Sequence, residues 1–278
     1  KSQYFALTGA RMHYVDEGHG RPLLMVHGNP TWSFYYRRLI AEFRQQYRPI
    51  AIDHVGCGLS DKPAQYGYCL ADRIDDLTDF IEAKDLRNVT LLAHDWGGAI
   101  GLGAVLRCPE RFSQLVLFNT SAFPPPFIPK RIAACRLPLL GTLGIRGLNL
   151  FARAALWMAV EDRRNLPAAV RQGLLAPYNS WANRVAIDRF VKDIPRPSDS
   201  TWKTLSTIEN GLSNLHQPCI LMWGMKDWCF NTTCLERLQR LFPQAQTHPL
   251  PNAGHYVVEE AIDEIIGVLR SFFSSVPN

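Results

Sequence analysis

The stretch that decides the fold runs Leu91-Leu92-Ala93-His94-Asp95-Trp96-Gly97-Gly98. An apolar run typical of a buried strand turns here into an apolar helix, with small residues two positions before and two positions after Asp95. This spacing predicts a nucleophile elbow, a sharp turn that excludes larger neighbours and lifts its central residue above the sheet. The usual central residue is serine, whereas here it is aspartate. An aspartate before a helix can also be a simple N-cap, and this stretch alone does not separate the two interpretations.

Around this turn the chain alternates between predicted strands and helices. Apolar periodicity predicts strands over residues 4–7, 11–16, 23–26, 49–53, 89–93 and 115–118, and helices over 31–47, 70–83 and 100–106. Thr31 or Ser33 is the expected N-cap of the first helix. Alternation of this kind predicts an α/β fold, with a mostly parallel sheet and helices on both faces.

The alternation stops at Ala122-Phe123-Pro124-Pro125-Pro126. It resumes with a strand at 219–223, a helix at 232–241, a strand at 246–250 and a last helix over 256–273. The residues between show helix-like segments without a buried strand. We therefore predict a core formed by residues 1–120 and 211–278, with a helical cap, or lid, inserted over 121–210.

Charge is concentrated in that insertion. The chain has 278 residues and a net charge of +5. Residues 121–210 hold 13 Lys and Arg against 6 Asp and Glu. No recognition motif or aromatic platform accompanies this charge, so we expect no nucleic-acid partner. A basic and apolar cap leaves open a membrane surface or a second copy of the chain as its partner.

The compartment is predicted from the cysteines and from the start of the sequence. The 7 cysteines form no C-x-x-C pair, which favours reduced packing thiols and hence the cytosol. No signal-peptide pattern opens the sequence, and the apolar run 112–129 contains four prolines, which does not fit a membrane-spanning helix.

Two further loops complete a catalytic set. Asn252-Ala253-Gly254-His255 precedes the last helix, and Gly224-Met225-Lys226-Asp227 follows an apolar strand. Each loop alone fits a surface histidine or a turn aspartate. Together they follow the order nucleophile, acid, histidine that this kind of fold uses. We therefore predict a triad of Asp95, Asp227 and His255.

A fourth loop, His27-Gly28-Asn29-Pro30, follows the third predicted strand. This position supplies one backbone N–H of an oxyanion hole, and the residue after the nucleophile supplies the other. Asn29 and Trp96 are the predicted donors. A plain turn is the simpler interpretation of the loop, but a turn alone does not require this combination of residues.

These motifs, together with Asp53-His54-Val55-Gly56-Cys57-Gly58-Leu59-Ser60-Asp61, resemble the haloalkane dehalogenases of the α/β-hydrolase fold. The resemblance covers the core better than the cap. It is closest to the subgroup with an Asp–His–Asp triad and an Asn–Trp halide pair, which implies that Asn29 and Trp96 bind halide. Another subgroup places its acid after the strand that ends at Phe118, where this chain has Asn119-Thr120.

The residue types suit displacement at a saturated carbon. A carboxylate is ionised at neutral pH, with an ordinary pKa of about 3.9, so Asp95 can attack without a base and form an alkyl ester. His255 then activates water to hydrolyse that ester, and Asp227 stabilises the imidazolium. The expected substrate is a small hydrophobic haloalkane and the expected product includes halide. No cofactor is expected, and no metal either, because His13, His19, His54 and Cys57 lack ligand spacing.

Several alternatives share this machinery. β-Lactone decarboxylases that form long-chain alkenes resemble the same subgroup, and the apolar cap segments 137–140, 148–151 and 154–158 fit a long substrate. Epoxide hydrolases need two cap tyrosines, whereas Tyr178 is the one tyrosine between Thr120 and Asn210. Fluoroacetate dehalogenases need arginines where Trp96 stands, and serine esterases need G-x-S-x-G. A ligand-binding protein of this fold need not keep a complete triad. We therefore expect a haloalkane dehalogenase, with β-lactone decarboxylase as the alternative.

Overall fold

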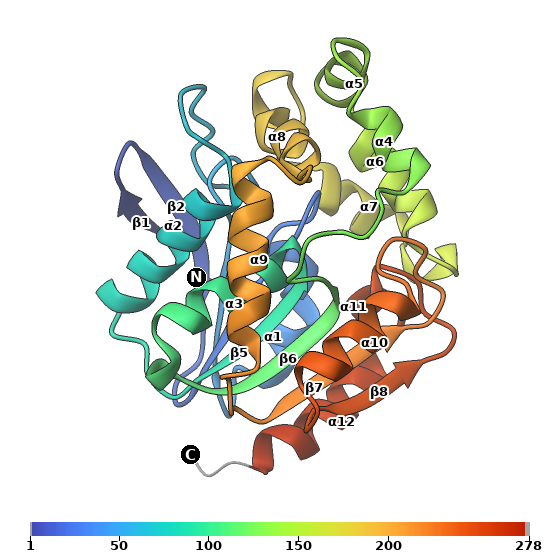
Figure 1. Ribbon diagram of the computed structural model, residues 1–278. Coiled ribbons are helices and arrows are strands. Elements are labelled where there is room, and N and C mark those ends of the chain that lie inside the picture. Colours follow the sequence, from blue (N-terminus) through green and yellow to red (C-terminus); the bar gives the residue numbers. More distant parts are fainter. Residues whose placement is uncertain (1, 276–278) are drawn as a thin grey trace.

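The computed structural model describes residues 2–275, which build one eight-stranded sheet between layers of helices (Figure 1). The spatial order of the strands is β1-β2-β4-β3-β5-β6-β7-β8. Antiparallel pairing joins β1 to β2 and β2 to β4, and every other neighbouring pair is parallel. The strands are β1 Ser2–Leu7, β2 Ala10–Asp16, β3 Pro22–Val26, β4 Arg48–Ile52, β5 Val89–Asp95, β6 Phe112–Thr120, β7 Cys219–Gly224 and β8 Gln246–Leu250.

Helices cover both faces of the sheet because its central strands are apolar on both sides. Successive side chains of a strand point to opposite faces, so Leu24 and Val26 pack in one core while Leu23 and Met25 pack in the other. The first core is covered by α2 (Leu70–Ala83), α3 (Trp96–Arg107), α9 (Ser200–Leu212) and α10 (Thr232–Leu241). The second is covered by α1 (Arg37–Phe43), α11 (Val257–Glu260) and α12 (Ile262–Ser274). The predicted α/β architecture is confirmed.

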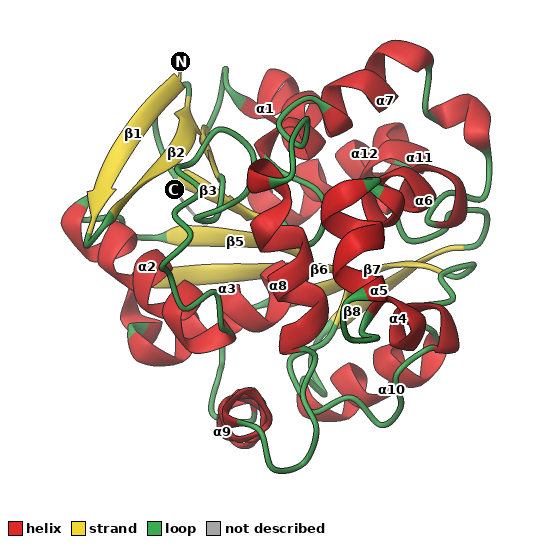
Figure 2. Ribbon diagram, turned by 90° about the horizontal axis from the view of Figure 1, so that it is seen from above, coloured by secondary structure: helices red, strands yellow, loops and turns green. Residues whose placement is uncertain are grey.

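Between β6 and β7 the described chain contains helices and turns. The helices before α9 are α4 Lys130–Cys135, α5 Leu140–Thr142, α6 Leu150–Met158, α7 Ala168–Leu175 and α8 Val185–Asp193. They lie above the carboxyl edge of the sheet (Figure 2). In contrast, α9 packs on α3 and α2 of the core layer. The division of the chain into a core and a cap, with boundaries at residues 120 and 210, stays a prediction.

Two local predictions differ from the structure. Neither Thr31 nor Ser33 caps a helix with its side chain: the first turn is a 3-10 helix, Ser33–Tyr36, and the Ser33 backbone N–H donates to Asp53 at 2.6 Å. The predicted last helix is two helices, because the backbone leaves the helical region at Ala261, with φ −126° and ψ 28°. Glu260, just before this break, accepts backbone N–H groups of Glu161 and Asp162.

Candidate active site

Asp95 is the last residue of β5 and lies in a strained turn. Its φ of 55° is unusual for a residue other than glycine, and α3 begins at the next residue. A Cβ on Gly97 would lie 2.1 Å from the Val26 carbonyl oxygen, and one on Gly98 would lie 1.9 Å from the Thr120 hydroxyl. The glycines are therefore required by close packing, as the predicted elbow demands. The Asp95 side chain makes no N-cap hydrogen bond, so the N-cap interpretation is wrong.

The loop after β3 holds the Asp95 carboxylate. The backbone N–H of Asn29 donates to Asp95 Oδ1 at 2.6 Å, and the backbone N–H of Trp96 also favours the charged form of this carboxylate, lowering its pKa. A Cβ on Gly28 would lie 2.0 Å from Asp95 Oδ1, so glycine is needed for this approach. The two backbone donors predicted for the oxyanion hole thus converge on one side chain.

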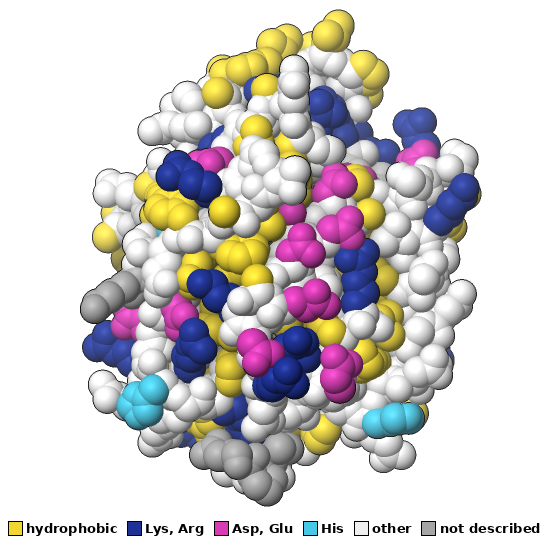
Figure 3. Space-filling view, turned by 90° about the vertical axis from the view of Figure 1, so that its left-hand side faces the viewer, with side chains coloured by type: hydrophobic (Ala, Val, Ile, Leu, Met, Phe, Trp, Pro, Cys, Tyr) yellow, Lys and Arg dark blue, Asp and Glu magenta, His cyan; other side chains and the backbone are white. Residues whose placement is uncertain are grey.

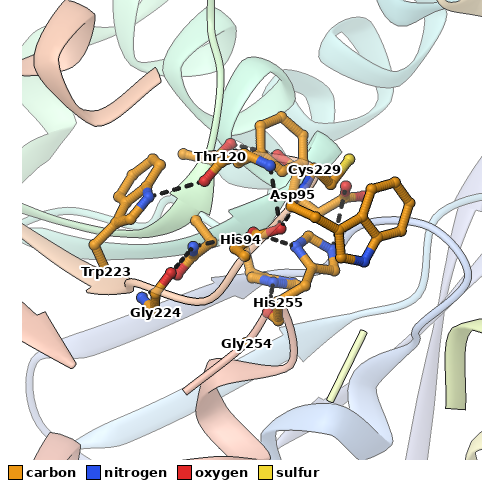
Figure 4. A network of polar contacts seen from close by, with 12 residues as sticks. His94, Asp95, Thr120, Trp223, Gly224, Cys229, Gly254 and His255 are labelled. Carbon is orange, nitrogen blue, oxygen red and sulfur yellow. Dashed lines mark hydrogen bonds and ion pairs between the residues drawn. The ribbon is translucent and has the colours of Figure 1, made fainter. Parts of the chain in front are cut away.

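The three predicted triad residues are buried, and Figure 4 shows two of them, Asp95 and His255, close together. His255 Nδ1 lies 2.8 Å from Asp227 Oδ2, and His255 Nε2 lies 3.7 Å from Asp95 Oδ2. The histidine therefore stands between the two carboxylates, with its Nε2 edge toward Asp95. The space beside Asp95 and His255 is where a water or a substrate atom would lie during reaction.

The surroundings raise the pKa of both Asp95 and His255. Burial raises the pKa of Asp95 above its ordinary value, against the lowering effect of His255 and of the two backbone donors. Burial alone would lower the pKa of His255, but the Asp227 and Asp95 carboxylates outweigh it and raise that pKa. An imidazole held between carboxylates can take a proton from water and stay charged, as a general base must.

An apolar cavity of about 780 Å³ ends on this site. Asp95, His255, Asn29 and Trp96 line its base. The Asn29 side chain donates to the Ile187 carbonyl oxygen at 3.4 Å, while its Oδ1 is buried without a partner. The walls come from the segment between β6 and β7, including Ile132, Ile145, Phe151, Met158 and Val191. The predicted halide pair and the predicted triad therefore face the same space.

Comparison with known proteins agrees with this geometry. A model of the alpha/beta hydrolase fold matches residues 21–137. The chain is 41% identical to the cis-3-alkyl-4-alkyloxetan-2-one decarboxylase of Shewanella oneidensis, over 99% of this chain and 88% of that protein.

The chain belongs to the α/β-hydrolase fold family.

Its relatives in this family also include haloalkane dehalogenase 2 of Mycobacterium tuberculosis, 30% identical over 98% of this chain and 95% of that protein. The crystal structure of haloalkane dehalogenase DatA from Agrobacterium tumefaciens C58 superposes with a TM-score of 0.91 at 25% identity, covering 100% of this chain and 97% of that chain. The predicted family resemblance is confirmed. The relatives named above are of two kinds, alkyloxetanone decarboxylases and haloalkane dehalogenases.

Three residues of this α/β-hydrolase site were missed by the sequence reasoning. Asn119 donates to Asp227 Oδ2 at 3.0 Å and accepts the Gly224 backbone N–H at 2.7 Å. His94 donates from Nε2 to the His255 carbonyl oxygen at 2.9 Å, and burial keeps its pKa well below the ordinary value, so it is neutral. The Thr120 hydroxyl donates to the Asp95 carbonyl oxygen. His94 precedes Asp95 in the sequence, and Asn119 and Thr120 lie on β6, the strand that pairs with β5. The hydrogen-bond partners of all three residues lie far away in the sequence.

Replacing Gly28 with alanine should lower kcat/KM about 100-fold, because a displacement of the attacking carboxylate by about 1 Å is costly. The new Cβ would lie 2.0 Å from Asp95 Oδ1, so the carboxylate must move. The matched control is Gly267→Ala on α12, where a Cβ meets nothing within 4 Å. That variant should keep full activity and gain up to about 1 kcal/mol of stability. Equal kcat/KM values for the two variants would mean that the approach at Gly28 does not matter.

Proposed function

We propose that this enzyme decarboxylates β-lactones carrying two long alkyl chains, releasing CO₂ and an alkene. The observation that carries the proposal is the apolar cavity of about 780 Å³ that ends on Asp95 and His255. Ligand cavities span about 300–1,000 Å³, so this one is larger than a short haloalkane requires. The relation to an alkyloxetanone decarboxylase at 41% identity supports the same substrate class.

The chemistry follows from a carboxylate that is ionised and buried. Asp95 attacks the saturated ring carbon that is bonded to the ring oxygen. An ester bond forms to this carbon while its bond to the ring oxygen breaks, which releases the lactone carbonyl group as a carboxylate. The released carboxylate is an anion beside the Trp96 indole N–H and the Asn29 amide, both of which line the cavity. In this proposal they hold the substrate carboxylate as they would a halide.

The ester intermediate then fragments without water. The C–C bond to the carboxylate breaks, CO₂ leaves, its electron pair forms the alkene, and the ester C–O bond breaks to return the Asp95 carboxylate. The backbone N–H groups of Asn29 and Trp96 stabilise that leaving carboxylate. An apolar cavity favours this step because it leaves the reacting carboxylate poorly solvated.

Haloalkane hydrolysis is the second candidate. It is favoured by the position of Asn29 and Trp96 beside Asp95 at the base of the cavity and by the relation to haloalkane dehalogenase 2. This reaction needs His255 to activate water against the alkyl ester. Epoxide hydrolysis is not supported, because the Tyr178 hydroxyl donates to the Thr31 carbonyl oxygen at 3.1 Å and does not line the cavity.

The deciding experiment is a paired assay of the purified enzyme. One arm follows alkene from a cis-dialkyl β-lactone, the other follows halide from a long-chain bromoalkane, and both are run in H₂¹⁸O. Fast alkene formation without ¹⁸O in Asp95 supports the proposal. Fast halide release with ¹⁸O in Asp95 and little alkene overturns it in favour of dehalogenation. Ligand binding without turnover in either arm would indicate a non-catalytic protein.

The pH profiles of the two arms should differ on the acid side. Hydrolysis requires neutral His255, whose pKa is raised by Asp227 and Asp95, so kcat for alcohol formation should fall as the pH drops through that raised value. Fragmentation requires the ionised form of Asp95 and no base, so alkene formation should persist to lower pH. It is lost when Asp95 protonates, at a pH above that of a free aspartate, because burial raises its pKa. Identical acid limbs would argue against a water-free second step.

A further inference from the structure

The cap tip, which we define as residues 137–150, exposes a cluster of leucines. Figure 3 shows apolar side chains at the top of the molecule, at the height of α5 in Figure 1. The exposed fractions are 51% for Leu137, 79% for Leu139, 71% for Leu140, 54% for Leu143, 66% for Leu148 and 53% for Leu150. Contiguous exposed apolar surface marks a binding face, since water solvates it poorly.

The sequence of the cap tip and its flanks carries charge of one sign, and the Asp188 carboxylate that contacts Thr142 of the tip is paired with Lys192. Residues 121–160 contain five basic residues and no Asp or Glu: Lys130, Arg131, Arg136, Arg146 and Arg153. The ion pairs between described residues 121–210 are Arg164–Asp162 and Lys192–Asp188, which involve none of these five. Two exposed tryptophans lie under arginines nearby: Arg146 lies 4.7 Å from the Trp181 ring centre and Arg163 lies 4.1 Å from that of Trp157. Exposed leucines, tryptophans and unpaired cations are the composition of a surface that binds anionic lipid.

The cap tip also borders the cavity. Leu140 and Leu150 are exposed to solvent and line the cavity that ends on Asp95. An apolar molecule can therefore pass between the outer surface of the tip and the site along leucine side chains. A bilayer is a phase in which long-chain apolar molecules dissolve.

We propose that the cap tip docks on the surface of an anionic phospholipid bilayer. Its leucines insert among the acyl chains, and Arg146 of the tip lies at the headgroups together with the flanking Lys130, Arg136 and Arg153, so the cavity opens toward the lipid phase. Contact is peripheral, because no helix of the described residues is long and apolar enough to span a bilayer. A second copy fits this face less well, since two tips would bring their cations together without a carboxylate from residues 121–160 to offset them.

The docking goes beyond the proposed reaction and can be measured without turnover. Co-sedimentation of the native protein with vesicles of phosphatidylcholine plus phosphatidylglycerol should give binding about tenfold tighter than with phosphatidylcholine alone. Added salt should weaken that binding. The variant Leu139→Asn/Leu143→Ser/Leu148→Ser should bind the anionic vesicles at least about tenfold more weakly. Asparagine is used at 139 because this position has a φ of 59°.

Two controls separate docking from misfolding. The three substituted leucines do not line the cavity, so the variant should turn over a short water-soluble substrate at the native rate. Tyr4→Ser removes an apolar side chain of 49% exposure from β1, at the edge of the sheet, and should bind vesicles like the native protein.

Three results would overturn the docking proposal. They are no binding of the native protein to anionic vesicles, equal binding by the triple variant, or a dimer in solution that the triple substitution dissociates. The last result would assign the tip to a second copy of the chain. Vesicle binding by a protein that turns over neither β-lactone nor bromoalkane would overturn the proposed function and support docking.

Discussion

Asp95→Asn should abolish alkene formation and halide release alike, with kcat lowered by about 10⁴-fold or more. An amide is not a nucleophile, so no ester forms, although its oxygen can still accept the Asn29 N–H that bonds to Asp95 Oδ1 at 2.6 Å. Burial raises the pKa of Asp95, so at neutral pH the fold is destabilised by the ionised form. The neutral variant should therefore melt at the same temperature as the native enzyme or higher. Product chromatography and thermal unfolding measure the two effects.

The matched control for this variant is Asp16→Asn. That carboxylate bonds to Arg48 on β4 at 2.7 Å, in the antiparallel part of the sheet, and does not line the cavity. Its replacement should leave kcat unchanged. Intact mass must be checked, since deamidation would regenerate aspartate in the Asp95 variant. More than a few per cent of native activity in a sample of the correct mass would remove Asp95 from the role of nucleophile.

His255→Gln should separate the two reactions. With a bromoalkane, one halide per enzyme should be released and turnover should then slow by about 10³-fold, because the ester on Asp95 has no base to activate water. The ester should be visible as a mass increase on the intact protein. With a β-lactone, alkene should continue to form at a rate about 10- to 100-fold lower. Fragmentation needs no water, and the variant loses only the positive charge of His255 that stabilises the Asp95 carboxylate.

His248→Gln is the control for this second variant. His248 is a partly exposed histidine paired with Glu264 at 2.8 Å, remote from the cavity lining, and its replacement should change neither reaction. If His255→Gln stops alkene formation and accumulates an adduct from the lactone, water enters the second step and the fragmentation route is wrong. If no adduct accumulates from a bromoalkane that the native enzyme hydrolyses, the covalent route for dehalogenation is wrong.

Much of the fold, and the convergence of Asp95, Asp227 and His255 at one place, could be predicted because local patterns carry them. The catalytic role of the three residues stays a prediction. Buried parallel strands are short apolar runs, and the predicted 219–223 strand matches β7, which is buried throughout. The predicted 70–83 helix matches α2. The carboxyl ends of parallel strands meet at one edge of the sheet. Asp95 at the end of β5, Asp227 shortly after β7 and His255 in the loop after β8 therefore converge there. The elbow adds a steric rule that selects glycine on one side of Asp95.

What could not be predicted depends on contacts between distant residues. Asn119 positions Asp227 across 108 residues, and His94 holds the His255 carbonyl oxygen across 161 residues. An asparagine at the end of a strand, such as Asn119 in β6, carries no mark of such a partner. The break at Ala261 was hidden for a related reason: the apolar periodicity continues through it, while Glu260 bonds to backbone far away in the sequence.

The direct pairing of β6 with β7 has an evolutionary consequence. Leu115 to Phe118 align in register with Cys219 to Met222, although about 100 residues separate the two strands in the sequence. The pairing of these two strands thus does not depend on the cap helices before α9, although α9 itself packs on the core layer. Cavity walls can be exchanged by insertion, deletion or recombination at that junction while the reactive groups keep their geometry. Relatives that act on lactones and on haloalkanes are the kind of diversity that such a modular junction permits.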